Sequence, residues 1–420
     1  MAVVSLPGMR VESRATDRPA LRRALQRGER RRAWLAIALI APLAIFLLLN
    51  FFAPIALLLA RGVTDREVPD VWPATAVALH DWDGSGLPNE MTVRRFVEEL
   101  AASSASGKLT AAANRLNYDL PGSRSLVLHT AAALPLPAGS NPLVALTELD
   151  ARWGEPQTWA AIQRAAGPYT SFYLLATLDL RLDENGDVVR TPADQAVFVD
   201  VFVRTFWISA VVAVLCAVLG YPLAYAMARL PERYANLLLI LVLLPFWTSV
   251  LVRTTAWMVL LQDRGLINDL LMRLGLIERP LELIYNRAGV YIAMTHVLLP
   301  YFILPLYGVM KRVPPFTMRA ALSLGATPLQ AFWRVYFPQT RPGVAAGTLI
   351  VFILALGYYI TPALVGGAGD QMISYFIAFY TNQSLNWGMA AALSLVLLLI
   401  TLLLLLLHWR VTGRRELAMR

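Results

Sequence analysis

The sequence has little charge, almost no lysine and a single cysteine. Charged residues make up 15% of its 420 residues, whereas a soluble surface usually needs about a quarter. Hydrophobic residues make up 57% and the mean hydropathy is +0.54, which excludes a disordered or collagen-like chain. Cys216 stands alone, so no intrachain disulfide can form. The composition therefore indicates an integral membrane protein with some mass in water.

The motifs of catalysis and cofactor binding are also missing. No glycine-rich loop runs into Lys-Ser or Lys-Thr, so the chain is not expected to bind ATP and Mg²⁺ by itself. No G-x-S-x-G elbow occurs, and the four histidines lack metal-ligand spacing. The arginines that give the net charge of +9 gather beside apolar runs, which indicates membrane topology and no nucleic-acid partner. We expect a protein that is not an enzyme and has neither metal site nor cofactor.

Six apolar stretches are long enough to cross a lipid bilayer, which takes roughly 20 residues per helix. Arg253 interrupts the third stretch and leaves 237–252 as its uncharged part. The pattern predicts an all-α polytopic membrane protein with six transmembrane helices. The expected spans are 34–59, 199–227, 237–261, 289–310, 343–365 and 388–409.

The charge of the connecting segments predicts their side of the membrane. The tail 1–33 holds nine arginines and three acids, and loop 311–342 holds five basic residues and no acid. Segment 61–198 holds 17 acidic and 11 basic residues. Because basic loops stay in the cytoplasm, we expect both termini inside. The expected parts are a tail 1–33, a first span 34–60, an extracytoplasmic domain 61–198, a five-helix core 199–409 and a tail 410–420.

The segment 61–198 is long enough for a small folded domain inserted between the first two spans. Helical spacing of apolar residues over 92–116 and alternation over 178–189, around Asn185-Gly186, predict an α+β domain. Thr191-Pro192 has the form of a helix start. We therefore expect one unbroken helix from Pro192 to Met227 that extends well beyond the outer surface of the membrane.

The cytoplasmic loop 311–342 contains two helix signals joined by a glycine. A short helix is expected from the Pro314-Pro315 pair to Leu322, and Gly325 is expected to end it with positive φ. A second helix is expected to start at Thr327, with Gln330 completing a capping box. It would carry one apolar stripe and end at two prolines. The stripe is Leu329, Phe332, Trp333 and Tyr336, and the prolines are Pro338 and Pro342.

Two interpretations of this helix pair stay open. An amphipathic helix with such a stripe can lie in the lipid headgroup layer. It can also dock in a groove of a soluble partner.

The loop resembles a known motif. The run Arg-Ala-Ala-Leu-Ser-Leu-Gly-Ala at 319–326, followed by Val-Tyr-Phe-Pro at 335–338, resembles the E-A-A-x3-G-x9-I-x-L-P coupling loop of type I permeases of ABC importers. Arg319 stands where the family has glutamate, and Ser323 stands where an acid is common. The resemblance implies an ATPase-coupling role for Arg319, Ala320, Ala321, Gly325, Ala326, Leu329, Phe332, Trp333 and Pro338.

Further segments resemble one branch of these permeases. The runs 245–257, 265–268 and 357–367 are similar to the spermidine/putrescine branch, and the similarity extends over about 199–409. It implies a substrate path that uses Trp247, Arg253, Trp257, Tyr301, Tyr358, Tyr359 and Pro362. Opine, aminophosphonate and ferric-ion permeases share much of this pattern and stay open as alternatives.

The same resemblance implies a location in a bacterial inner membrane, and it implies the partners. They are a cytoplasmic ATPase dimer that holds ATP and Mg²⁺, a second and different permease subunit, an extracytoplasmic substrate-binding protein, and the lipid bilayer. Two readings of other classes remain. An ATP-independent secondary transporter would be expected to show intramembrane ionisable groups, and a membrane-anchored enzyme would need a catalytic constellation that the sequence does not contain.

Overall fold

The computed structural model describes residues 34–137, 140–183 and 187–417, and the side chains up to residue 410. The chain divides into two units, 1–58 and 59–420. One helix begins at Trp34 and continues to Ala60. It contains a π-helical turn at Leu48–Phe52 and then α2, Ala53–Ala60. At 27 residues it is about 40 Å long, which is enough to cross the hydrocarbon core.

Five helices in the described ranges are long and apolar enough to span a membrane, or six when one bent pair counts as a single span. The fold is therefore the predicted helical membrane fold. The straight candidates are Trp34–Ala60, Phe198–Arg229, Arg287–Met310, Pro328–Leu356 and Trp387–Arg410.

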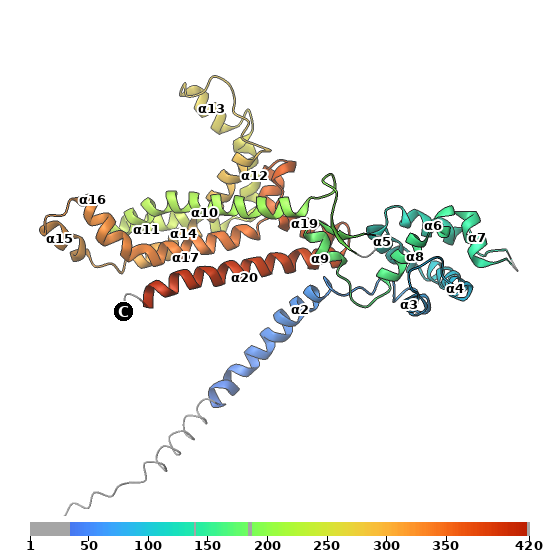
Figure 1. Ribbon diagram of the computed structural model, residues 1–420. Helices are drawn as coiled ribbons and strands as arrows, with labels where there is room; N and C mark the ends of the chain where they lie inside the picture. Colours follow the sequence, from blue (N-terminus) through green and yellow to red (C-terminus); the bar gives the residue numbers. More distant parts are fainter. Residues whose placement is uncertain (1–33, 138–139, 184–186, 418–420) are drawn as a thin grey trace, which may run out of the picture. The chain divides into compact units, whose positions relative to one another are not determined.

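Three helices form the centre of the bundle: α10 (Phe198–Arg229), α14 (Arg287–Met310) and α17 (Phe337–Leu356). They run side by side in Figure 1. Phe302 of α14 is fully buried and lies between two glycines. A Cβ on Gly220 would approach the Phe302 ring to 2.5 Å, and a Cβ on Gly347 would approach the Phe302 carbonyl to 2.8 Å. The missing side chains let the helices approach closely, as small residues do in membrane bundles.

The predicted third span is bent and not straight. Helix α11 (Glu232–Leu243) continues into a 3₁₀ turn at Leu244–Trp247, and α12 (Val250–Leu261) starts after a bend of 101°. Pro245 interrupts the backbone hydrogen bonds. The Ser249 hydroxyl accepts the Val252 N–H at 3.2 Å and caps α12. The segment ends in α13, Leu266–Arg273.

The predicted fifth span is also divided. Helix α17 ends at Leu356, and α18 (Ile360–Val365) follows after Gly357. A 3₁₀ turn at Ala368–Asp370 and α19 (Ile373–Asn382) lead to the last span, α20 (Trp387–Leu417).

The inserted segment is mostly helical and has a core of its own. Four large aromatic side chains, Trp72, Phe96, Trp153 and Trp159, are fully buried in it, with ring centroids 5.1–5.5 Å apart. Such tilted and edge-on pairs stabilise beyond their buried area. The helices are α3 (Pro73–His80), α4 (Glu90–Ser106), α5 (Leu109–Asp119), α6 (Ser123–Ala132), α7 (Pro142–Leu149), α8 (Pro156–Ala165) and α9 (Phe172–Thr177), with a 3₁₀ turn at Ala151–Gly154.

The predicted hairpin is present. Strand β1 (Leu180–Leu182) pairs antiparallel with β2 (Val188–Arg190), and Arg181 faces Val189. Asn185-Gly186, the predicted turn, lie outside the described residues. In the described part of the chain this hairpin is the whole sheet.

A buried ion pair joins two parts of this domain. The Arg115 guanidinium is fully buried and bonds the Asp65 carboxylate, and its Nη1 lies 3.3 Å from Asp119 Oδ2. The rings of Phe172 and Tyr173 lie 4.7 Å and 5.4 Å from the guanidinium carbon. A buried guanidinium needs such partners because an unpaired charge is costly in the interior. Burial raises the pKa of Asp119, and the charge of Arg115 opposes that effect.

The second span does not start at Pro192. The chain turns at 193–195, and α10 begins at Phe198. The cap is the Asp179 carboxylate, which accepts the N–H groups of Val197, Phe198 and Val199 at 2.8–3.0 Å. Asp179 lies 18 residues before the first of these groups, so no local motif marks this start. At 32 residues, α10 is still about 48 Å long, longer than the hydrocarbon core of about 30 Å.

Candidate functional site

The loop between α14 and α17 forms two short helices. Helix α15 (Pro315–Ser323) ends in a Schellman motif, in which Ala326 N–H donates to Ala321 O at 3.1 Å and Gly325 N–H donates to Leu322 O at 3.0 Å. Gly325 has φ +90°, as predicted. That conformation favours glycine because a Cβ would meet the backbone.

The second helix begins as the sequence predicts. The Thr327 hydroxyl accepts the Gln330 N–H at 3.3 Å, and the Gln330 side chain accepts the Thr327 N–H at 3.1 Å. This capping box opens α16, Pro328–Ala331. A single π-helical turn, Phe332–Tyr336, then joins α16 directly to α17.

Pro338 and Pro342 do not end this helix, contrary to the sequence prediction. Pro338 falls in the first turn of α17 and Pro342 lies inside it. The Phe337 N–H donates to the Phe332 carbonyl, and this wider turn accommodates the nearby proline without breaking the helix.

The predicted apolar stripe divides into two faces, because the π turn changes the angular spacing of its side chains. Phe332 and the buried Tyr336 pack on Tyr221 and Tyr225 of α10, with ring centroids 5.2–6.0 Å apart. Arg229 lies 4.8 Å over the Tyr225 ring and 5.1 Å over the Tyr336 ring. These contacts fasten the loop to the bundle.

The other face of the loop is exposed and apolar. We call it the docking face, made of Phe316, Leu324, Leu329 and Trp333, which are 54–89% exposed. Arg319 and Ala320 are exposed beside it, and Ala321, Ala326 and Pro338 are half-buried. Large apolar side chains that gather in the open mark an interaction surface.

The predicted substrate-path residues are only partly brought together. The Trp257 indole N–H donates to His296 Nδ1 at 3.1 Å, and the centroids of the two rings lie 5.3 Å apart. Arg253 Nε is buried and has no hydrogen-bond partner among the described residues. The Tyr301 ring packs against the Phe246 ring, tilted by 59° with centroids 5.0 Å apart.

Of the remaining residues of that set, two are exposed and one is buried. Trp247 is 77% exposed on the 3₁₀ turn, and Tyr359 is 41% exposed before α18. Pro362 is buried in α18, where the neighbouring Thr361 meets Thr254 of α12 at 3.1 Å between hydroxyl oxygens. His296 was not among the predicted path residues. The available signal was a titratable side chain inside an apolar span.

We call Arg253, Trp257, His296, Tyr301 and Tyr358 the path cluster. It has a cation and aromatic rings but no acid. The sequence 283–369 holds neither Asp nor Glu, and neither does 233–262. No group of three or more His, Cys, Asp or Glu suited to a metal ion occurs within the described residues. The arrangement offers hydrogen bonds, ring faces and one guanidinium, and no general acid–base pair.

Comparison with known proteins places this geometry in a family. Residues 220–414 match the model of the binding-protein-dependent transport system inner membrane component. The chain is 33% identical over 215 residues to the spermidine/putrescine transport system permease protein PotB of Salmonella typhimurium SL1344, covering 51% of this chain and 75% of that protein. It is 35% identical to the inner membrane ABC transporter permease protein YdcU of Escherichia coli K12, covering 47% and 66%.

A structure comparison gives a more distant match. A chain of the bacterial alginate ABC transporter in complex with a periplasmic protein is 17% identical, with a TM-score of 0.44, over 52% of this chain and 78% of that chain.

Proposed function

The chain belongs to the family of inner-membrane components of binding-protein-dependent transport systems, and from this premise we propose that it passes a polyamine such as spermidine or putrescine into the cytoplasm. It is a permease subunit of an ABC importer and not an enzyme. The observation that carries the choice of solute is the 33% identity to spermidine/putrescine permeases over 215 residues.

The path cluster supports a cationic solute in part. Ring faces attract ammonium groups, and Trp257, Tyr301 and Tyr358 supply them near the bend of α12. A polyammonium ion also needs carboxylates, which the segments 233–262 and 283–369 of this chain do not contain. We propose that a second, different permease subunit supplies them.

A second candidate solute is an aminophosphonate. The observation that favours it is the buried Arg253 Nε without a hydrogen-bond partner in the described part of the chain. A guanidinium binds phosphonate oxygens well because its planar fork matches them.

The uptake experiment separates the two solutes. The chain is coexpressed with its ATPase, second permease and binding protein, and uptake of labelled spermidine is measured with unlabelled putrescine or 2-aminoethylphosphonate as competitor. Competition by putrescine alone supports the polyamine. Competition by the phosphonate alone, or no spermidine uptake, contradicts it.

We also propose that the docking face contacts a cytoplasmic ATPase dimer that binds ATP and Mg²⁺. Its four apolar side chains are exposed, while Phe332 and Tyr336 anchor the same helix to α10. A displacement of the docking face by the ATPase would therefore be transmitted to the transmembrane bundle. Arg319 stands exposed beside the face and should meet an acidic group of the ATPase.

The coupling prediction uses three variants. Trp333→Ala should weaken docking by about 2 kcal/mol if the ring is a buried anchor of the complex. Gly325→Val should strain the left-handed residue, and Arg319→Glu should uncouple transport. ATPase stimulation and uptake of the reconstituted complex are compared with Arg312→Glu, a charge reversal outside the helix pair. Normal coupling in all three variants would contradict the assignment.

The orientation and the outer domain complete the proposal. We propose that both termini are cytoplasmic, because the tail 1–33 and loop 311–342 are strongly basic. The domain 61–198 then faces outward and borders the place where the substrate-binding protein binds. Its own buried aromatic core supports an independent folded unit in that position.

A further inference from the structure

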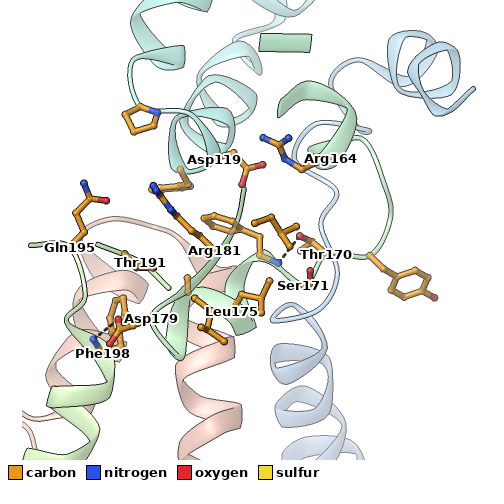
Figure 2. A pocket seen from close by; sticks show the side chains of 17 residues that line it. Asp119, Arg164, Thr170, Ser171, Leu175, Asp179, Arg181, Thr191, Gln195 and Phe198 are labelled. Atoms are coloured by element: carbon orange, nitrogen blue, oxygen red, sulfur yellow. Dashed lines mark hydrogen bonds between the residues drawn. The ribbon is translucent and has the colours of Figure 1, made fainter. Parts of the chain in front are cut away.

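A polar cavity lies where the inserted domain meets the start of α10. Its volume is about 390 Å³. Figure 2 shows side chains from α5, α8, α9 and β1 converging on it. Its lining includes the acids Asp119 and Asp179, the cations Arg164 and Arg181, and the polar side chains of Tyr118, Thr170, Ser171, Thr191 and Gln195.

The acids of this cavity are already engaged. Asp119 pairs with the buried Arg115, and Asp179 accepts three backbone N–H groups of the α10 start. Figure 2 draws no hydrogen bond from the guanidinium of Arg164 or of Arg181 to another residue that lines the cavity. Burial raises the pKa of Asp119, and the charge of Arg164 opposes that effect. The planar guanidiniums of Arg164 and Arg181 are therefore available to an anionic group, which they would bind with charge-assisted hydrogen bonds.

An apolar groove of about 550 Å³ adjoins the cavity along α10 and α20. Phe198 lines the cavity and Phe202 lines the groove, four residues further along α10, a rise of about 6 Å. Leu175 of α9 lines the cavity, and Leu178, directly after the end of α9, lines the groove. Val203 and Trp207 of the groove are 60–62% exposed.

We propose that the cavity and the groove together bind one phospholipid, with its phosphate between Arg164 and Arg181 and an acyl chain in the groove. A phospholipid joins an anion to a long apolar chain, and these two adjoining surfaces require both. In the proposed orientation the lipid belongs to the outer leaflet. The site is separate from Arg253 and Trp257 of α12, so it does not depend on which solute is transported.

The experiment measures the lipid that stays bound. The full chain is purified in detergent and washed extensively, and phospholipid phosphorus per chain is determined together with native mass spectrometry. Wild type should retain about one phospholipid. The double variant Arg164→Gln, Arg181→Gln should bind it at least about tenfold more weakly, since two charge-assisted hydrogen bonds are lost. Arg190→Gln, on β2 and outside the cavity, is the matched control and should retain the lipid.

A second variant tests the groove without touching the arginines. Val203→Trp should fill the groove and displace the lipid, while Val218→Trp, equally exposed on α10 but outside the groove, should not. Lipid-depleted wild type should be stabilised against heat by dioleoyl phosphatidylglycerol and not by dioleoylglycerol, which lacks the phosphate. Equal lipid retention in the double variant and in Val203→Trp would overturn the proposal. Stabilisation by inorganic phosphate with no retained lipid would overturn it too, because the site would then take a free anion.

Discussion

Gly347 shows how a single residue holds two spans together. A Cβ at this position would lie 2.8 Å from the Phe302 carbonyl on α14, and backbone cannot move aside as a flexible side chain can. Gly308 also lies in a spanning helix, but a Cβ there would meet nothing within 4 Å.

These two glycines give a matched prediction. Gly347→Ala should force α14 and α17 apart and destabilise the bundle by about 1–3 kcal/mol, the usual cost of overpacking. Gly308→Ala should be neutral or stabilising by up to about 1 kcal/mol, because alanine is the better helix former. Thermal unfolding of the purified full chain in one detergent compares them. Equal loss in both variants would show that the close approach is not what matters.

Glu67 is a half-buried carboxyl in the inserted domain, and its pKa is raised first by burial and then by the nearby Asp65. A carboxyl whose folded pKa lies above its unfolded pKa destabilises the fold when it is ionised. The penalty is present at neutral pH and is relieved as the pH falls through the raised folded pKa.

Glu67→Gln should therefore raise the unfolding temperature at pH 7, and the gain should shrink as the pH approaches 4. Unfolding is followed at both values, with Glu98→Gln as control because the Glu98 side chain is exposed on α4. A gain that is the same at both pH values would contradict the assignment to an ionised carboxylate.

At the scale of the element, the start of α10 depends on a residue from outside the helix. Asp179 accepts three N–H groups there and itself has φ +54°. Asp and Asn tolerate this region better than most residues. The hairpin that follows Asp179 is thereby tied to the top of the span.

Asp179→Ala should free those amides and cost about 1–2 kcal/mol, the usual cost of a lost cap. Asp179→Asn keeps an acceptor oxygen and should lose less. Hydrogen exchange at the amides of 197–199 in the full chain measures the effect directly. Unchanged protection in the alanine variant would mean that another group caps the helix.

The sequence predicts those elements whose determinants are local. The Thr327–Gln330 capping box and the positive φ of Gly325 were both readable because every partner lies within a few residues. The start of α10 was not, since its cap lies 18 residues upstream of its nearest partner. The bend after Trp247 had a local signal in Pro245 and Ser249, but the high hydropathy of the segment favoured a straight span. The pairing of Trp257 with His296 joins residues 39 apart, which no spacing rule reports.

At the scale of the whole molecule, charge should determine orientation. Arginine is concentrated in the tail 1–33 and in loop 311–342, and acids are concentrated in 61–198. Reporter fusions after residue 130 and after residue 325 should report opposite sides, outside and inside respectively. The same side for both, or the reverse assignment, would contradict the proposed topology.

The continuity of the helix through Pro338 and Pro342 affects how motion of the loop is transmitted. From Pro328 to Leu356 it is one rod of 29 residues, about 43 Å long. Its stiffness is not uniform, because two prolines lack N–H donors and the turn at Phe332–Tyr336 is wider than the rest. A displacement of the loop end should first bend the section 332–342, because this section is more flexible than the rest of the helix. Small thermal displacements of the loop would be taken up by bending of this section. Only a sustained displacement of the loop would move the far end of the helix at Gly357, next to Tyr358.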